Sequence, residues 1–248
     1  MKRLFDIVAS GVGLVVASPI LVPVSLLVWL QDRHSPFYIA PRTGKGGRPF
    51  RMVKLRSMVV NADRSGVDST GASDRRITQI GRFIRGGKLD ELPQLWNVLV
   101  GDMSLVGPRP NVKRETDLYT QEERRLLHAR PGITDFASIV FADEGDILKD
   151  QADPDIAYNQ LIRPGKSRLG IFYVDHRSLW VDVQLCLLTI VALTSRPMAL
   201  AGLQRLLRSS GADGALVELA GRTSALVPMP PPGGDRLVTS RDGDPGTP

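Results

Sequence analysis

The first hydrophobic pattern in the chain is a stretch of 24 residues without a charge, residues 7–30. A straight helix of this length would rise about 36 Å, which is enough to cross a bilayer. A cleaved signal peptide fits poorly, because the stretch is too long and no small-residue cleavage site precedes a plausible mature start. The pattern therefore predicts a membrane element.

Two features argue against a simple spanning helix. Ser18-Pro19 lies in the middle of the stretch, and a proline there removes a backbone donor and kinks the helix. Basic residues flank both ends, with Lys2 and Arg3 before the stretch and seven Lys and Arg within 33–56 after it. Such residues favour the cytoplasmic side. A helix that breaks at Ser18-Pro19 and returns satisfies both features, with the Ser18 hydroxyl bonding a freed carbonyl. The residues alone leave the spanning and re-entrant arrangements equally open.

After the apolar stretch, short strands and helices are predicted. Residues 37–58 contain two short apolar segments around a Gly-rich turn, the pattern of a β-hairpin. Lys54 and Arg56 share one face of the second strand by the period of two. They are either solvated cations that protect a sheet edge or part of an anion site. The isoleucines of residues 77–87 recur at helical spacing, and a Gly pair ends that helix.

The next helix carries the most informative pattern. Pro93 is tolerated only in the first turn, so the helix begins near Asp90-Glu91 and both carboxylates lie at its N-terminus. That position favours anions, so the pair is either a simple cap or a nucleophile and Mg²⁺ ligand. Apolar residues at positions i, i+3, i+4 and i+7 predict a buried stripe, formed by Leu92, Leu95, Trp96 and Leu99.

Two further arginines are candidates for phosphate contacts. Pro108 and Pro110 fix the backbone on either side of Arg109, which suits bidentate contact with phosphate. An ordinary turn with a surface arginine is the alternative. Arg130 closes a helix that begins with the capping box Thr120-x-x-Glu123, and it is a second candidate for the same contact.

The charge of the chain indicates an anionic partner. The 248 residues carry a net charge of +6, and residues 42–130 alone hold 18 Lys and Arg against 10 Asp and Glu. Nucleic acid, lipid headgroups and a phosphorylated small molecule all fit. The single cysteine excludes an internal disulfide framework and a multi-cysteine metal site, and it fits a reducing compartment.

Four segments between Lys2 and about Thr134 resemble the bacterial sugar transferase family, the monotopic polyprenol-phosphate phosphoglycosyl transferases. They are the apolar stretch, the KLRSM strand, residues 81–110 and the ARPGIT sequence, and residues 89–110 are the most specific. The resemblance implies an enzyme on the cytoplasmic face of the bacterial inner membrane that acts early in polysaccharide or glycoconjugate synthesis. Its substrates would be a UDP-sugar and polyprenol phosphate, with Mg²⁺ as cofactor and UMP as product.

The resemblance also implies residue roles. Asp90 would attack the donor phosphate, form a covalent phosphosugar intermediate and hold Mg²⁺, with Glu91 as its partner. Ser18 and Pro19 would mark the break of the membrane helix. The cations implied to hold phosphates are Lys54, Arg56, Arg85, Arg109 and Arg130. After RPGIT the family's usual Gly-Trp-Ala-Gln-Val continuation is replaced by DFASIVFADEGDIL, so the identity of the sugar stays open.

The expected fold is α+β and mostly helical, with a re-entrant membrane helix and a small cytoplasmic catalytic domain that contains a short β-hairpin. Residues 1–36 would form the anchor, 37–208 the catalytic domain and 209–248 a disordered Gly/Ala/Pro-rich tail. A helix over 178–194 is too short to span a membrane, so it belongs to the core or the membrane interface, and it is available for pairing in a homodimer. The acidic segment 142–155 reads as a solvated loop.

Two other classes of protein remain as alternatives. The basic segment 42–130 suits a membrane-anchored nucleic-acid-binding protein, but the chain lacks a recognisable reading helix, so no nucleic-acid partner is expected. A membrane scaffold, in which Asp90-Glu91 merely caps a helix, is the other.

Overall fold

The computed structural model describes residues 1–62 and 74–240, and it confirms a mostly helical protein with a short antiparallel hairpin. The strands are β1 (Phe37–Thr43), β2 (Pro49–Leu55), β3 (Ser104–Val106) and β4 (Gly132–Thr134). The α-helices are α1 (Lys2–Asp32), α2 (Gln79–Gly86), α3 (Gln94–Val100), α4 (Lys113–Asp117), α5 (Phe136–Val140), α6 (Glu144–Ile147), α7 (Pro154–Ala157), α8 (Arg163–His176), α9 (Leu179–Thr194), α10 (Arg196–Ser209) and α11 (Gly214–Gly221). The remaining turns of helix are η1 (Lys45–Gly47), η3 (Leu89–Glu91), η4 (Glu123–His128) and η5 (Tyr158–Ile162).

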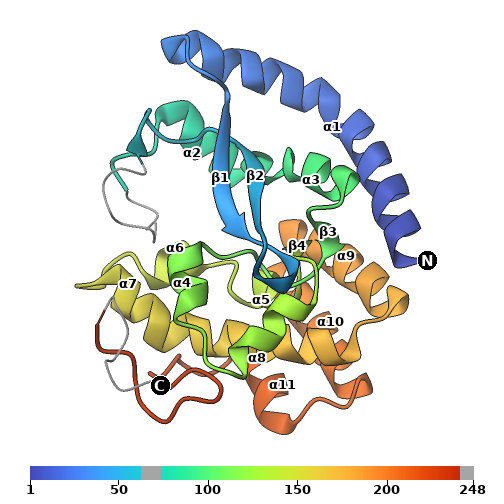
Figure 1. Cartoon of the computed structure of the whole chain (residues 1–248), viewed down its shortest axis with the longest axis vertical. Helices are drawn as coiled ribbons and strands as arrows, with labels where there is room; N and C mark the ends of the chain where they lie inside the picture. Colours follow the sequence, from blue (N-terminus) through green and yellow to red (C-terminus); the bar gives the residue numbers. More distant parts are fainter. Residues whose placement is uncertain (63–73, 241–248) are drawn as a thin grey trace.

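The apolar stretch forms one continuous helix, α1, whose axis bends partway along (Figure 1). The predicted break at Ser18-Pro19 is therefore wrong as a break in the backbone. Pro19 has no N–H for the carbonyl of Val15, but the Ser18 hydroxyl donates to that oxygen at 2.8 Å. Because the freed carbonyl keeps a partner, the helix bends without ending.

Both ends of α1 are bonded to the rest of the protein. At the start, Lys2 forms an ion pair with Asp182 of α9 at 2.5 Å. At the end, the Arg56 guanidinium holds Asp32 with two bonds of 2.6 Å. Most apolar side chains between these ends are exposed, and within the described residues α1 is the one helix long and apolar enough to cross a membrane. This composition indicates membrane association.

The predicted hairpin is confirmed, because β1 pairs with β2 in antiparallel register from Phe37–Leu55 to Thr43–Pro49. The helix predicted over 77–87 is α2, which Thr78 caps at its start and Gly87 at its end. Side chains of α1, β2 and α2 form a small core between them, made of Val24, Val28, Leu55 and Ile84.

The predicted buried stripe on the helix after Pro93 is wrong. Trp96 is 54% exposed, whereas Gln94, Asn97 and Val98 are buried. The polar side is buried because it meets the hairpin, where Asn97 accepts from the Val53 amide at 2.9 Å and donates to the Arg51 carbonyl at 2.7 Å. A side-chain amide thus satisfies a strand edge that would otherwise lack partners.

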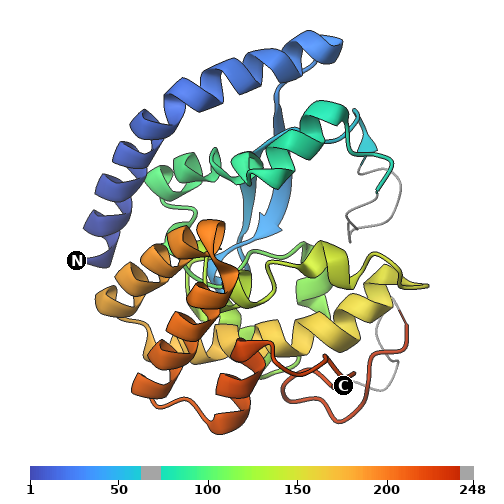
Figure 2. The same cartoon turned by 180° about the vertical axis from the view of Figure 1, so that it is seen from behind.

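The main core lies where α5, α8, α9, α10 and α11 pack together, at the end of the molecule away from the bend of α1 (Figures 1 and 2). The prediction of a disordered tail after Ser209 is wrong for α11. Asp213 caps this helix, and Leu216, Val217 and Ala220 are buried in the core. The segment after Ser209 is rich in Gly, Ala and Pro, but it contains one short apolar helix that burial in the core stabilises. Residues 241–248 of the predicted tail lie outside the described part.

The predicted helix over 178–194 is confirmed as α9, with Ser178 as its cap. One face enters the core through Val181 and Leu185. The other face carries exposed apolar side chains, among them Trp180, which is 71% exposed, and Leu193. The helix is therefore half core and half apolar surface.

Candidate active site

Three segments bring four charged side chains together. Lys54 comes from β2, Asp90 and Glu91 from η3, and Arg109 from the loop that follows β3. Arg109 Nη2 donates to Glu91 Oε1 at 2.6 Å, and Lys54 Nζ lies 3.7 Å from the same oxygen. The sequence-predicted nucleophile, its partner and two predicted phosphate-binding cations are thus neighbours.

Tight backbone packing fixes the Arg109 loop. β3 pairs in parallel with β4, with Ser104 opposite Gly132 and Val106 opposite Thr134. Just beyond β3, a Cβ atom on Gly107 would lie 2.2 Å from a backbone carbonyl oxygen, a distance that no side chain allows. Only glycine fits there, and this close packing fixes the path of the backbone into the Pro-Arg-Pro turn.

Burial and neighbouring charges shift the pKa values of the two carboxylates in opposite directions. Burial raises the pKa of Asp90, and the nearby Lys54 charge opposes this rise only in part. Burial would also raise the pKa of Glu91, but Arg109 and Lys54 overcome it and lower that pKa to about 2. Burial and the Arg109 charge lower the pKa of Lys54, while Glu91 above all raises that of Arg109. Glu91 is therefore a permanently ionised counterion.

Asp90 differs from its neighbour in having no assigned partner. Within residues 1–62 and 74–240, no hydrogen bond or ion pair reaches its carboxylate. The same residues contain no group of three or more potential metal-ligating side chains. Mg²⁺ binds one or two carboxylates together with phosphate oxygens, and Asp90 is the carboxylate of this site that could hold such a cation.

Arg85 and Arg56, two further predicted phosphate-binding cations, lie in different surroundings. The charge of Arg85, in the last turn of α2, acts on Asp90. Arg56 lies at the end of α1, where Asp32, Ser35 and Val28 accept bonds from its guanidinium. These bonds give Arg56 a structural role, and its phosphate contact stays a prediction.

In the part of the chain that the structure describes, no hydrogen bond or ion pair joins three more of the predicted residues to the cluster. The Arg130 side chain is exposed, and its backbone packs against Gly107. Ser18 and Pro19 lie within α1, where the Ser18 hydroxyl donates to the Val15 carbonyl. The capping box predicted before Arg130 is confirmed by two 3.1 Å hydrogen bonds between Thr120 and Glu123.

Two charged residues near the site were missed by sequence reasoning. Glu144 of α6 forms an ion pair with Lys166 of α8, and its charge acts on Arg109. Glu144 belongs to the acidic segment that was expected to be a solvated loop. The departure of this segment from the family pattern is the one sequence signal that could have pointed to it. The pairing of Glu144 with Lys166 could not be predicted, because it joins residues 22 positions apart and follows no local pattern.

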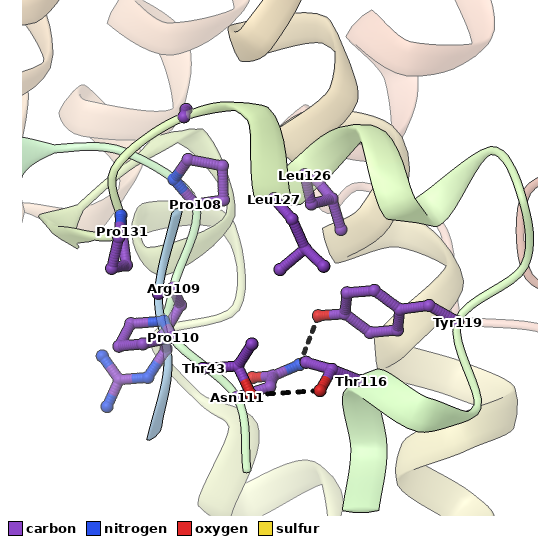
Figure 3. A pocket seen from close by; sticks show the side chains of 12 residues that line it. Thr43, Pro108, Arg109, Pro110, Asn111, Thr116, Tyr119, Leu126, Leu127 and Pro131 are labelled. Atoms are coloured by element: carbon purple, nitrogen blue, oxygen red, sulfur yellow. Dashed lines mark hydrogen bonds between the residues drawn. The ribbon is translucent and has the colours of Figure 1, made fainter. Parts of the chain in front are cut away.

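Hollows lie beside the loop that carries Arg109. Figure 3 shows the first, where Leu126 and Leu127 face Thr43 and hydrogen bonds join Asn111 to Tyr119 and Thr43 to Thr116. It has room for about one water molecule. A second hollow, of about 40 Å³, extends from Arg109 to residues of α5 and α8. Arg109 lines both hollows, and the second is the larger of the two.

Comparisons with known proteins show what the chain is similar to. The family described as bacterial sugar transferase matches residues 1–196. The chain is 34% identical over 195 residues to the UDP-glucose:undecaprenyl-phosphate glucose-1-phosphate transferase of Caulobacter vibrioides, covering 77% of this chain and 69% of that protein. It is 33% identical over 195 residues to the UDP-N-acetylgalactosamine-undecaprenyl-phosphate N-acetylgalactosaminephosphotransferase of Aeromonas hydrophila, covering 77% of this chain and 43% of that protein. The chain thus spans less than half the length of the second relative.

Proposed function

The chain belongs to the bacterial sugar transferase family, and from this premise we propose that it transfers a phosphosugar from a UDP-sugar to a polyprenol phosphate such as undecaprenyl phosphate. The observation that carries the proposal is an unpartnered carboxylate, Asp90, beside three charges that are paired with one another. The reaction would serve polysaccharide or glycoconjugate synthesis.

The proposed reaction has two steps at one phosphorus atom. A carboxylate oxygen of Asp90 attacks the β-phosphorus of the donor, and the bond to the bridging oxygen breaks, so that UMP leaves with that oxygen. A phosphate oxygen of the polyprenol phosphate then attacks the same phosphorus. The bond to Asp90 breaks, which regenerates the carboxylate and leaves a polyprenyl diphosphosugar. Splitting the transfer in this way means that the soluble and lipid substrates need not meet.

The paired charges support this chemistry by position. Arg109, held by Glu91, and Lys54 offset the charge of a diphosphate that would otherwise repel Asp90. Glu91, with a pKa of about 2, is a poor proton acceptor near neutral pH, so we assign it to positioning. Mg²⁺ bound by Asp90 would supply further neutralisation of phosphate charge.

The bonds at both ends of α1 support a re-entrant arrangement on the cytoplasmic face of the inner membrane. A straight helix of 31 residues would be about 46 Å long, and its ends would lie on opposite sides of a bilayer. In this protein Lys2 and Asp32 both bond to one folded body. Such bonds favour a helix that enters and leaves through the same leaflet.

The proposal is tested by UMP release from membrane-embedded protein with Mg²⁺, polyprenol phosphate and a panel of UDP-sugars. We expect one donor to give UMP, and a radiolabelled sugar phosphate to appear on the wild type but not on Asp90→Asn. Asp117→Asn, which alters an exposed ion pair, is the matched control and should keep full activity. Undiminished labelling of Asp90→Asn would reject the nucleophile.

A further inference from the structure

Side chains in the first turns of α1 bond to β3 and to the end of α3, the two elements next in the chain to Arg109 and to Glu91. Asp6 is 1% exposed, although it lies on the helix that we place in the membrane. Its carboxylate accepts from the Ser104 hydroxyl at 3.0 Å and from the Leu105 amide at 3.1 Å. Lys2 donates to the Val106 carbonyl at 3.1 Å. Side chains of α1 thus hold every residue of β3.

These bonds complete a strand that has a neighbour on one side only. β3 pairs with β4 through one edge, and the groups on its other edge are buried or half-buried. Asp6 and Lys2 supply the partners that a third strand would otherwise supply. Lys2 is itself fixed by Asp182 and Tyr173, so the edge is held by a connected network.

Arg3 makes the equivalent connection to α3. Its guanidinium donates to the carbonyls of Val98 at 2.6 Å and Leu99 at 2.8 Å. These carbonyls lie in the last turn of α3, where a cation is favoured, and that of Val98 also accepts from the Gly101 amide. The turn with Asp90 and Glu91 precedes this helix, and Arg109 follows β3 by three residues.

From this arrangement we propose that Asp6, with Lys2 and Arg3, is a positioning residue that sets Arg109 against Glu91. It acts through the course of residues 104–110 and touches no substrate. The seating of the membrane helix and the geometry of the phosphate-binding arginine are thereby linked. The proposed consequence for catalysis rests on the proposed function.

The test is a double-mutant cycle between Asp6→Ala and Arg109→Lys, read as kcat for UMP release. We expect Asp6→Ala to lower kcat at least tenfold in the wild type and less than threefold when Arg109 is already lysine. Asp6→Asn keeps an acceptor for the Leu105 amide and should recover part of the loss. Asp213→Ala, which removes the cap of the distant α11, is the matched control and should leave kcat unchanged.

Hydrogen exchange of residues 104–110 gives a second readout that needs no turnover. We expect faster exchange there in Asp6→Ala and no change in Asp213→Ala. If Asp6→Ala does not fold, Asp6→Asn and Ser104→Ala take its place in both arms.

Equal losses of kcat in both backgrounds, or unchanged exchange, would overturn the inference. If the wild type releases no UMP from any donor, the proposed function fails, and the exchange measurement still decides whether Asp6 orders the Arg109 loop.

Discussion

Replacing Glu91 by Gln tests the assignment of this carboxylate to positioning. The change keeps the shape of the side chain and removes its charge, which faces Arg109 at 2.6 Å and Lys54 at 3.7 Å. A unit pair about 4 Å apart is worth about 4 kcal/mol at an effective dielectric constant of 20. Because Arg109 is 37% exposed, solvent screening reduces this figure to about 2 kcal/mol. We therefore expect kcat/KM to fall roughly 30-fold.

The assay is a single turnover without the lipid acceptor, so that only the first step is seen. If Glu91 positions Arg109, the burst of UMP slows in Glu91→Gln by about the same 30-fold. If Glu91 takes a proton from the acceptor, the burst is unchanged and only the second step slows. An unchanged burst would therefore refute the reasoning. Glu91→Asp should recover part of the rate, and Glu122→Gln, in an exposed ion pair, is the matched control.

Three other predictions concern the rest of the chain. Burial raises the pKa of Cys186 to about 11, so less of its thiol is ionised at pH 8. Alkylation of Cys186 should therefore run roughly 100-fold slower than in urea-unfolded protein, and its rate should rise with pH. Equal rates in folded and unfolded protein would contradict this. Leu207→Ala should lower the free energy of unfolding by about 2–5 kcal/mol, because Leu207 of α10 is fully buried in the main core. An unchanged denaturant titration would contradict this. Pro19→Ala restores a backbone donor for the Val15 carbonyl and should straighten α1, whose two ends are bonded to the rest of the protein. UMP release should slow while the protein stays in the membrane fraction. Full activity would show that the bend is unimportant.

Local signals in the sequence predicted the elements that local interactions stabilise. The hairpin, the Thr120-Glu123 capping box and the Ser18 bond to a freed carbonyl each depend on residues close together in the chain. The proximity of Lys54, Glu91 and Arg109 came from the family resemblance, because nothing in the local pattern brings β2, η3 and the Pro-Arg-Pro turn together.

Several features that the sequence did not reveal depend on a distant partner. Arg56 is paired with Asp32, which lies 24 residues away. Glu144 meets Lys166 across two helices. α11 is ordered by burial in a core that includes α5 and α8. Composition and spacing describe a segment by itself, so they could not identify these partners.

The burial of Asn97 and the exposure of Trp96 on α3 fit the proposed use of a lipid substrate. In water an amphipathic helix buries its apolar face, but here the polar Asn97 faces the hairpin and Trp96 is exposed. α3 also packs along α1, where Leu95 lies next to Gly13. An apolar surface beside a membrane helix is stable where lipid covers it. In the proposed arrangement, with α1 in one leaflet, Trp96 would lie at the membrane surface, and the Asp90-Glu91 turn, which precedes α3 in the chain, would lie at the height where a polyprenol phosphate carries its phosphate.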